Sequence, residues 1–352
     1  MAAPTNMHTT ARRTAPDLAA GGRAGSTDPR DAADAAVLIR GVAKRYERHV
    51  AVDGLSLTVP RGTVYGLLGP NGAGKTTTIR MILNIIAPDE GEIAVLGRPV
   101  ATSDVTDRVG YLPEERGLYK KMQVRQVLRF LAELKGVPAR VADGRIDAWL
   151  ERLGLVSEAK DWGNAKVDEL SRGMQQKVQF IGALVHEPEL VILDEPFSGL
   201  DPINAQALKD TVVELRGSGR TVIFSTHLME NAERMCDAVC IISNGIKVLD
   251  GAVADVKAEY GNQRVAVVLD GRAGTGEPAV LADPSVVRTS SGHGRLREIE
   301  LAPGADPQTL LRRLVGEGAS VERFELVRPS LHEIFLDKVG AAGIERGMSG
   351  HG

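Results

Sequence analysis

A glycine-rich loop between an apolar stretch and an amphipathic stretch is the feature that most constrains this chain. Residues 69–76 read Gly-Pro-Asn-Gly-Ala-Gly-Lys-Thr and fit the pattern G-x-x-x-x-G-K-[ST]. Residues 62–68, before the loop, are mostly apolar, as in a buried strand. The residues after the loop place apolar side chains on one helix face: Ile79, Ile82, Leu83 and Ile86. An accidental glycine-rich turn would lack this context, so we expect a phosphate-binding loop at the edge of an α/β sheet.

Two acidic residues follow a second apolar stretch, residues 190–193. Reacting groups gather at the carboxyl ends of strands in open α/β sheets, so these acids are expected at the same edge as the loop. We expect Asp194 to hold Mg²⁺, directly or through water, together with the hydroxyl of Thr76. Glu195 is expected to act as general base on an attacking water, and Lys75 to reach the β- and γ-phosphates of a nucleotide. A strand that simply ends in solvent is the plainer alternative, and the phosphate loop disfavours it.

A histidine follows a third apolar stretch, residues 221–225. A lone histidine is more often structural than functional, but a place at the same sheet edge reverses that preference. We therefore expect His227 to contact the γ-phosphate and to help orient the water.

The composition is ordinary for a globular protein of two domains. The 352 residues carry a net charge of −3 and only 4% aromatic side chains, which gives no reason to expect nucleic acid as a partner. No apolar run approaches the roughly 20 residues that a membrane-spanning helix needs, and the N-terminus lacks the apolar core of a signal peptide. The two cysteines, Cys236 and Cys240, are expected to be ordinary, mostly buried thiols. We expect a cytosolic protein that can dock on a membrane protein.

The first two thirds of the chain alternate strand-like and helix-like segments. Residues 1–36 lack apolar periodicity and are expected to form a disordered tail. Residues 37–251 predict a parallel sheet covered on both sides, with a helical region at about 115–185. A hairpin is expected within residues 239–249, where Asn244 and Gly245 supply the turn.

The last third predicts a small α+β domain over residues 252–340. Its candidate strands are residues 265–269, 298–301 and 321–327. A candidate helix covers residues 308–315, between the last two strands. A final helix begins at Ser330, where Ser330 and Glu333 fit a capping box. Residues 341–352 are expected to be a flexible tail.

Residues 170–176, Leu-Ser-Arg-Gly-Met-Gln-Gln, lie upstream of the acidic strand and supply the remaining motif. Ser171 suits a helix N-cap, and an apolar helix stripe follows it. Taken with the other motifs in their order, this segment resembles the signature of ATP-binding-cassette (ABC) ATPases, usually written L-S-G-G-Q. Arg172 and Met174 depart from that signature. The resemblance spans residues 37–251 and implies a P-loop NTPase of the ABC type: a RecA-like core, a helical subdomain and an antiparallel β-subdomain, followed here by the small C-terminal α+β domain.

In that family the signature of one subunit binds the γ-phosphate held by the phosphate loop of the other. The resemblance therefore implies that Ser171 and the backbone N–H of Gly173 contact ATP across a dimer interface, which suits an anion site at a helix N-terminus. It also implies that Tyr46 stacks on the adenine and that Asp201 lies in the loop that crosses to the opposing subunit. The other residues that it assigns to the nucleotide are Gly69, Pro70, Asn71, Gly72, Ala73, Gly74, Lys75, Thr76 and Thr77. A homodimer is expected.

One position departs from the family in a way that matters for the metal. Glu114 stands where the family usually carries a glutamine in the loop between the core and the helical subdomain. A carboxylate about 4 Å from a phosphate charge costs roughly 4 kcal/mol at an effective dielectric constant near 20. We therefore expect Glu114 to ligate Mg²⁺ or to stay withdrawn until it does.

The sequence from Glu114 onward resembles a bacterial subgroup of sodium- and drug-efflux ATPases that carry a similar C-terminal extension. Residues 329–335, Pro-Ser-Leu-His-Glu-Ile-Phe, match the end of that extension. The resemblance implies the ATPase subunit of an ABC exporter, bound to an integral membrane permease at the inner face of the cell membrane. A soluble ABC ATPase of translation or DNA repair is the alternative, although such proteins usually carry two cassettes or a long coiled-coil insertion. A nucleotide-binding module without turnover is a third, and the intact catalytic set argues against it.

Overall fold

The computed structural model describes residues 34–347, except residues 48, 103–104, 116, 262–263, 271–276, 293 and 328. The predicted tail lies outside the described residues up to residue 33, but Ala35 and Ala36 already belong to the first strand and are buried. The last helix extends to Gly347, past the predicted start of the C-terminal tail. No helix in the described part of the chain is long and apolar enough to cross a membrane.

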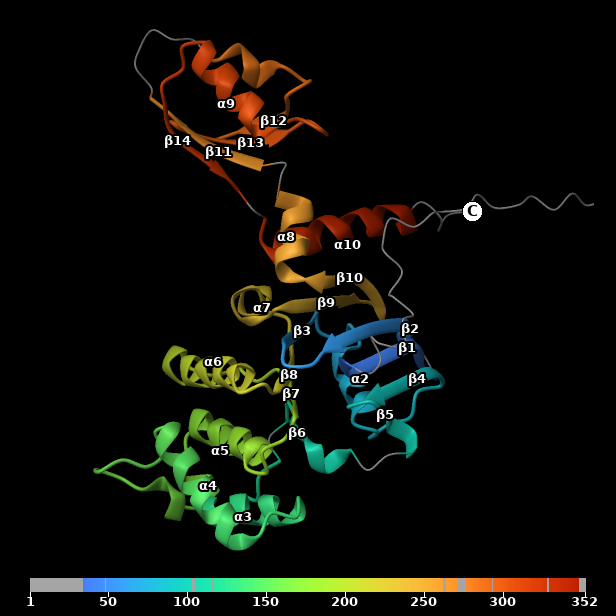
Figure 1. Ribbon diagram of the computed structural model, residues 1–352, viewed down its shortest axis with the longest axis vertical. Helices are drawn as coiled ribbons and strands as arrows, with labels where there is room; N and C mark the ends of the chain where they lie inside the picture. The colour runs from blue at the N-terminus through green and yellow to red at the C-terminus, as the bar shows by residue number, and fades with distance from the viewer. Residues whose placement is uncertain are drawn as a thin grey trace, which may run out of the picture.

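A six-stranded sheet forms the centre of the molecule, in the order β10-β9-β3-β8-β7-β6 (Figure 1). Its strands from β9 to β6 are parallel, and β10 joins the edge antiparallel to β9. Every residue of β3 and β7 is buried, which explains their continuous apolar sequence, because a parallel strand is covered on both faces. The strands are β3 (Val64–Leu68), β6 (Val109–Leu112), β7 (Leu190–Asp194), β8 (Thr221–Thr226), β9 (Ala238–Ser243) and β10 (Ile246–Ala252). The predicted hairpin is confirmed, with Asn244 and Gly245 both at positive φ in its turn.

Helices cover one face of this sheet, and a second sheet with a single helix covers the other. The helical face carries α3 (Val124–Leu134), α4 (Ala139–Arg152), α5 (Arg172–Leu184), α6 (Pro202–Gly217) and α7 (Met229–Met235), and shares one apolar core. The opposite core holds α2 (Lys75–Ile82) and an antiparallel sheet in the order β2-β1-β4-β5. That sheet consists of β1 (Ala35–Tyr46), β2 (His49–Pro60), β4 (Glu90–Val95) and β5 (Arg98–Pro99). The predicted α/β core, helical subdomain and antiparallel β-subdomain are thus confirmed.

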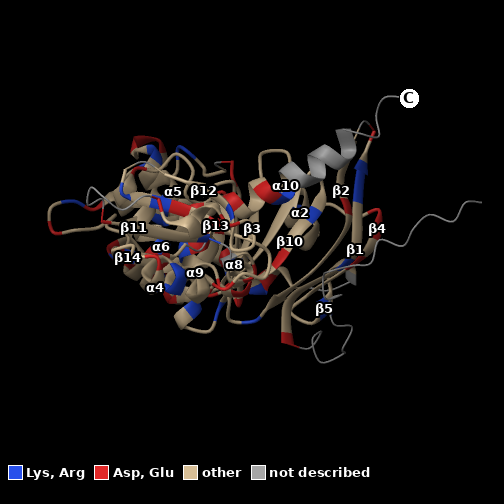
Figure 2. Cartoon of the chain, turned by 90° about the horizontal axis from the view of Figure 1, so that it is seen from above, with Lys and Arg blue, Asp and Glu red and all other residues tan. Residues whose placement is uncertain are grey.

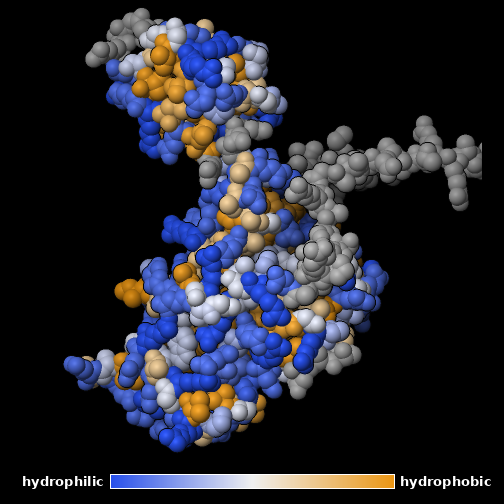
Figure 3. Space-filling model, viewed as in Figure 1, coloured by the Kyte–Doolittle hydropathy of each residue, from blue (hydrophilic) through white to orange (hydrophobic). Residues whose placement is uncertain are grey.

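The C-terminal part forms a separate body with its own core, and Figure 3 shows it as a distinct lobe. Its sheet has the order β12-β13-β11-β14 and carries one helix, α9. These elements are β11 (Arg264–Leu269), β12 (Val287–Ser291), β13 (Leu296–Leu301), α9 (Pro307–Gly316) and β14 (Val321–Leu326). The three predicted strands and the helix are confirmed, while β12 was not predicted because its residues Arg288 to Ser291 are polar and exposed.

Two helices connect this body to the rest: α8 (Val253–Gly261) leads into it and α10 (Leu331–Gly347) leads out. The predicted capping box at the start of α10 is confirmed, since the Ser330 N–H donates to Glu333 at 2.8 Å and the Glu333 N–H donates to the Ser330 hydroxyl at 3.2 Å. Helix α10 packs on the large body, although the predicted span of the small domain, residues 252–340, includes its start. Its buried residues Leu331 and Ile334 pack in the core of the large body, with α7.

Charged residues of both signs are interspersed over the elements seen in Figure 2. Both cysteines are free; Cys240 is fully buried on β9 and Cys236 is partly buried. Burial raises the pKa of the Cys240 thiol. Cys240 is therefore an ordinary buried thiol that packs in the core, as predicted.

Candidate active site

The glycine-rich loop folds where β3 ends and α2 begins, and two of its glycines are required by close backbone contacts. Gly69 has φ 150°, and a Cβ there would lie 2.1 Å from the Ile242 carbonyl oxygen. Gly74 has φ 106°, and a Cβ there would lie 2.4 Å from the Ala51 carbonyl oxygen. A side chain at either position would push the loop off the neighbouring strand ends. The sequence pattern and the fold thus agree on why these residues are glycine.

Lys75 is the first residue of α2, and its side chain is only 6% exposed. Its ammonium donates to the carbonyl oxygens of Gly69 at 2.8 Å and Pro70 at 3.1 Å. It also lies 3.7 Å from Oε1 of Glu195. The lysine charge is therefore held directly over the loop that is expected to bind phosphate.

Glu195 sits just past the end of β7 in a left-handed backbone conformation, with φ 47°. Such a conformation costs a non-glycine residue on the order of 1–3 kcal/mol and persists only where surrounding contacts impose it. Two contacts do so here. The Glu195 N–H donates to the Ser225 hydroxyl at 3.0 Å, and Nδ1 of His227 lies 3.0 Å from Oε1 of Glu195. The three residues predicted to be catalytic, Lys75, Glu195 and His227, therefore meet at one carboxylate oxygen.

Asp194 is the last residue of β7 and is 1% exposed. Its Oδ1 accepts a hydrogen bond from the Ser225 hydroxyl, whereas its Oδ2 is buried and has no hydrogen-bond partner among the described residues. A buried carboxylate oxygen without a partner is costly, and a cation or a cation-bound water would satisfy it. No group of three or more His, Cys, Asp or Glu residues in the described ranges could hold a metal ion. The unpartnered Oδ2 of Asp194 suits Mg²⁺, which commonly takes one or two carboxylates and completes its coordination with phosphate and water.

Ser225 was not predicted as a site residue. Its hydroxyl contacts both acids, since it donates to Asp194 and accepts from the Glu195 N–H. The parallel register places Asp194 opposite Ser225 on the adjacent strand β8. A hydroxyl directly after the apolar run of residues 222–224 was the available signal, because buried polar groups require partners.

A cavity of about 320 Å³ lies over the loop. Its lining includes two residues that sequence reasoning missed, His49 and Ala51, together with Glu114 and Glu195; the others belong to the loop and the start of α2: Asn71, Gly72, Ala73, Gly74, Lys75, Thr76 and Thr77. Glu114 therefore faces the same space as Lys75. Tyr46 is 45% exposed beside this cavity and stacks on His49, with ring centroids 5.6 Å apart.

The remaining predicted contacts lie on other elements and do not line that cavity. Ser171 caps α5, and its hydroxyl accepts from the Met174 N–H at 3.3 Å. Asp201 caps α6, where the Asn204 N–H donates to it at 3.0 Å and lowers the pKa of its carboxyl. Gly173 faces Asn204, whose Nδ2 would lie 2.8 Å from a Cβ at position 173. The signature residues thus form a second cluster at the start of α5 and α6, and none of them lines the cavity over the phosphate loop.

Together, the fold and the site define a P-loop ATPase domain of the cassette type with an appended C-terminal domain. The family model described as "ABC transporter" matches residues 52–198, and the model "ATP-binding protein DrrA1-3-like, C-terminal domain" matches residues 251–339. The chain is 44% identical to the ABC transporter ATP-binding protein YhaQ of Bacillus subtilis over 308 residues, which cover 85% of this chain and 97% of YhaQ. This chain belongs to the family of ABC transporter ATP-binding proteins, and it carries a DrrA-like C-terminal domain.

Two further likenesses are informative. The Nod factor export ATP-binding protein I of Burkholderia lata is 36% identical over 86% of this chain and 96% of its own length. A solved structure described as the ATP binding subunit of an ABC transporter superposes with a TM-score of 0.58 at 31% identity, and covers 64% of this chain and 93% of that one. The predicted family and fold are therefore confirmed.

Proposed function

We propose that this chain hydrolyses MgATP and thereby drives a separate membrane permease in export. The observation that carries the hydrolytic part is the meeting of Lys75 and His227 at Oε1 of Glu195, 3.7 and 3.0 Å away. Water that attacks a γ-phosphate needs a cation that binds the phosphate, a carboxylate base and a histidine. All three groups lie here at one edge of the sheet. The experiment is a phosphate-release assay on the full chain with MgATP.

Each residue then has a definite task. Lys75 and the loop N–H groups bind the β- and γ-phosphates, and Thr76 with Asp194 would hold Mg²⁺, which neutralises phosphate charge when bound. Glu195 takes the proton of the attacking water as general base. His227 holds the Glu195 carboxylate in place through the 3.0 Å contact and orients the water toward the γ-phosphate.

The site is completed by a second copy of the chain. Ser171 and Gly173 carry an anion-binding helix N-terminus, yet they do not line the cavity of their own phosphate loop. Two chains facing head to tail would place each signature cluster against the phosphate loop of the other. ATP is then bound between the subunits, and we infer that its binding closes the dimer.

Glu114 is expected to change the metal dependence of this reaction. It shares the cavity with Lys75 and Thr76, so Glu114→Gln removes one negative charge beside the nucleotide. We expect the variant to bind ATP as the wild type does and to shift the Mg²⁺ concentration for half-maximal hydrolysis, by about threefold or more, since one unit charge is removed. Mg²⁺ titrations of both proteins at saturating ATP measure this, and superimposable curves would refute a role for Glu114 in metal handling.

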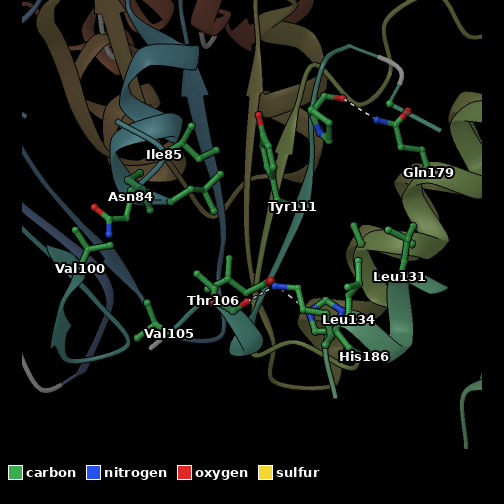
Figure 4. A pocket seen from close by; sticks show the side chains of 18 of the residues that line it. Asn84, Ile85, Val100, Val105, Thr106, Tyr111, Leu131, Leu134, Gln179 and His186 are labelled. Carbon is green, nitrogen blue, oxygen red and sulfur yellow. Dashed lines mark hydrogen bonds between the residues drawn. The ribbon is translucent and has the colours of Figure 1, made fainter. Parts of the chain in front are cut away.

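The permease is proposed to dock in an apolar cavity of about 410 Å³ between the core and the helical subdomain (Figure 4). Asn84 and Ile85, after α2, form one side, and Leu131 and Leu134 of α3 form the other. Two large apolar side chains that line it, Ile85 and Leu134, are 57% and 64% exposed, and Tyr119 and Phe130 nearby in the sequence of the lining segments are 53% and 38% exposed. Figure 3 shows an orange patch over α3. Exposed apolar patches of this kind mark interaction surfaces.

Two buried acceptors, one on α5 and one just after it, add polar requirements to that cavity. The Gln179 amide donates to the carbonyl oxygens of Pro113 and Glu115, which fixes its orientation, and its Oε1 has no hydrogen-bond partner among the described residues. His186 contacts the Val109 carbonyl through Nε2 at 3.2 Å, and its buried Nδ1 likewise has no partner there. Burial lowers the pKa of His186, so its Nδ1 is an acceptor. Because Gln179 also holds the loop of Glu114, an occupant of the cavity would be mechanically linked to the nucleotide site.

The docking proposal predicts the effect of a charge in this cavity. Leu134→Asp should reduce the amount of membrane protein that copurifies from detergent-solubilised membranes by about tenfold, because burying a leucine contributes about 1.5–3 kcal/mol. Val141→Asp is the matched control, since Val141 is an exposed apolar residue on α4 that does not line the cavity. Equal copurification with both variants would refute docking here. If no membrane protein copurifies with the wild type, the alternative of an ABC ATPase without a transport partner gains support.

The export direction rests on relatives. The Burkholderia lata relative is named for Nod factor export, and the C-terminal domain is of the DrrA1-3 type. We propose that this chain likewise serves an exporter, peripheral to the membrane through its permease.

A further inference from the structure

The C-terminal body is joined to the ATPase body only through α8 and α10 in the described part of the chain. The two connections run side by side where they meet the C-terminal sheet, because the Val327 N–H donates to the Arg264 carbonyl oxygen at 2.9 Å. Arg264 also pairs with Glu333 in the first turn of α10 at 3.2 Å. Any displacement of the C-terminal sheet must therefore pass through α8 and α10 together.

Both connections converge on one side chain of the ATPase body, Glu233 of α7. One carboxylate oxygen of Glu233 pairs with the ammonium of Lys257 on α8, and the other accepts the Leu331 N–H at the start of α10 at 3.1 Å. The carboxylate of Glu233 is three-quarters shielded from solvent, which strengthens both contacts. Ninety-eight residues of chain separate Glu233 and Leu331, so this is a tertiary contact and not a local one.

Apolar contacts surround this polar junction. Leu331 and Ile334 of α10 are at most 1% exposed and belong to the same core as Met229, Ala232 and Met235, the buried face of α7. Val253 and Val256 of α8 join that core. The buried face of α7 therefore packs against the core that both connections share, and Figure 1 shows α7 beside β9, below α8.

Helix α7 begins two residues after His227, the histidine that contacts Glu195. The Leu228 N–H donates to the Thr226 hydroxyl at 3.0 Å. This hydrogen bond restrains the short segment that joins His227 to α7. A rigid helix that shifts by a fraction of a turn at one end carries the residue at its other end with it. The position of α7 thus sets where the His227 ring lies.

We propose that Glu233 is a positioning residue for ATP hydrolysis: it ties α7, and through α7 the His227 ring, to the C-terminal body. The C-terminal body then tunes turnover, because a partner or a second copy that displaces it changes the alignment of His227 with Glu195. This inference rests on the proposed hydrolysis at this site.

The test uses steady-state ATP hydrolysis by the full chain over a range of ATP concentrations. Glu233→Ala removes both contacts, and Lys257→Gln removes one without touching α7. We expect Glu233→Ala to lower kcat about three- to tenfold, the size of effects carried through packed contacts, with the KM for ATP unchanged. Lys257→Gln should lower kcat less, and the double variant should match Glu233→Ala alone because both substitutions remove one shared contact. Glu230→Ala, the same substitution at an exposed residue of α7, is the control and should leave kcat unchanged.

Amide hydrogen exchange of the segment 226–236 supplies the readout that does not depend on turnover, and it should rise in Glu233→Ala and Lys257→Gln. Faster exchange with wild-type kcat would overturn the proposal, since α7 would then be anchored without any consequence for the site. Additive losses in the double variant, or a rise in KM together with a lower melting temperature, would also overturn it. A wild-type chain without ATPase activity would instead refute the proposed function.

Discussion

Glu195→Gln is expected to abolish turnover while it preserves ATP binding. The amide has almost the same shape as the carboxylate but cannot accept the proton of the attacking water. General bases contribute about 10²- to 10⁴-fold to rate, so phosphate release should fall at least a hundredfold. The loss of a negative charge beside the γ-phosphate and near Lys75 should favour bound ATP, so the variant should accumulate as an ATP-bound dimer.

Phosphate release and the solution mass measured by sedimentation, with and without MgATP, test this expectation. Glu92→Gln, an exposed glutamate on β4, is the matched control and should behave as the wild type. Wild-type turnover by Glu195→Gln would show that another group activates the water. A variant that binds ATP and stays monomeric would contradict closure of a dimer by ATP.

Lys75→Ala is expected to lose ATP affinity as well as turnover. The ammonium is the main positive charge over the loop, and each charge-assisted hydrogen bond contributes about 1.5–3 kcal/mol, so the Kd for ATP should rise about 10- to 100-fold. The variant also leaves the buried Glu195 carboxylate without its nearest cation, so its melting temperature should fall. Lys75→Arg keeps the charge and therefore separates the effect on stability from the effect on the phosphate site. It should restore the melting temperature better than turnover, because the loop carbonyls of Gly69 and Pro70 fit an ammonium.

Equilibrium ATP binding and thermal unfolding of the three proteins provide the measurement. Unchanged ATP affinity in Lys75→Ala would contradict the assignment of residues 69–76 as the phosphate site.

Much of the fold could be predicted because local sequence patterns determine it. The buried strands β3 and β7 are continuous apolar runs, and the turn at Asn244 and Gly245 has a defined backbone preference. Strand β12 escaped prediction because its polar residues show no alternation, and the packing of α10 on α7 escaped because contacts between distant segments leave no periodic signal. Where Leu331 lies is decided by tertiary packing alone.

Part of the site could likewise be predicted from the sequence, and part could not. Motif spacing predicts that Lys75, Glu195 and His227 share a sheet edge, but it cannot predict that they meet at a single oxygen. That geometry depends on the left-handed backbone of Glu195 and on the Ser225 hydroxyl, which only the register of β7 against β8 brings together.

The two departures in the signature have different surroundings. Met174 packs partly buried against the helical core, so an apolar side chain suits the position, and its backbone N–H keeps the cap of Ser171. Arg172 is exposed in the first turn of α5. The helix dipole disfavours a positive charge there, but under the proposed dimer this charge would attract the phosphate of the opposing site.

The claim that the site is shared between two chains can be tested by mixing two inactive variants. Lys75→Ala destroys the phosphate loop, and Ser171→Glu places a negative charge in the signature cluster. A mixed dimer then contains one ruined site and one site with an intact loop from one chain and an intact signature from the other. We predict that phosphate release, which is near zero for each variant alone, returns on mixing and reaches its maximum near equal amounts. A mixture that contains mixed dimers by mass yet stays as inactive as its components would contradict the account.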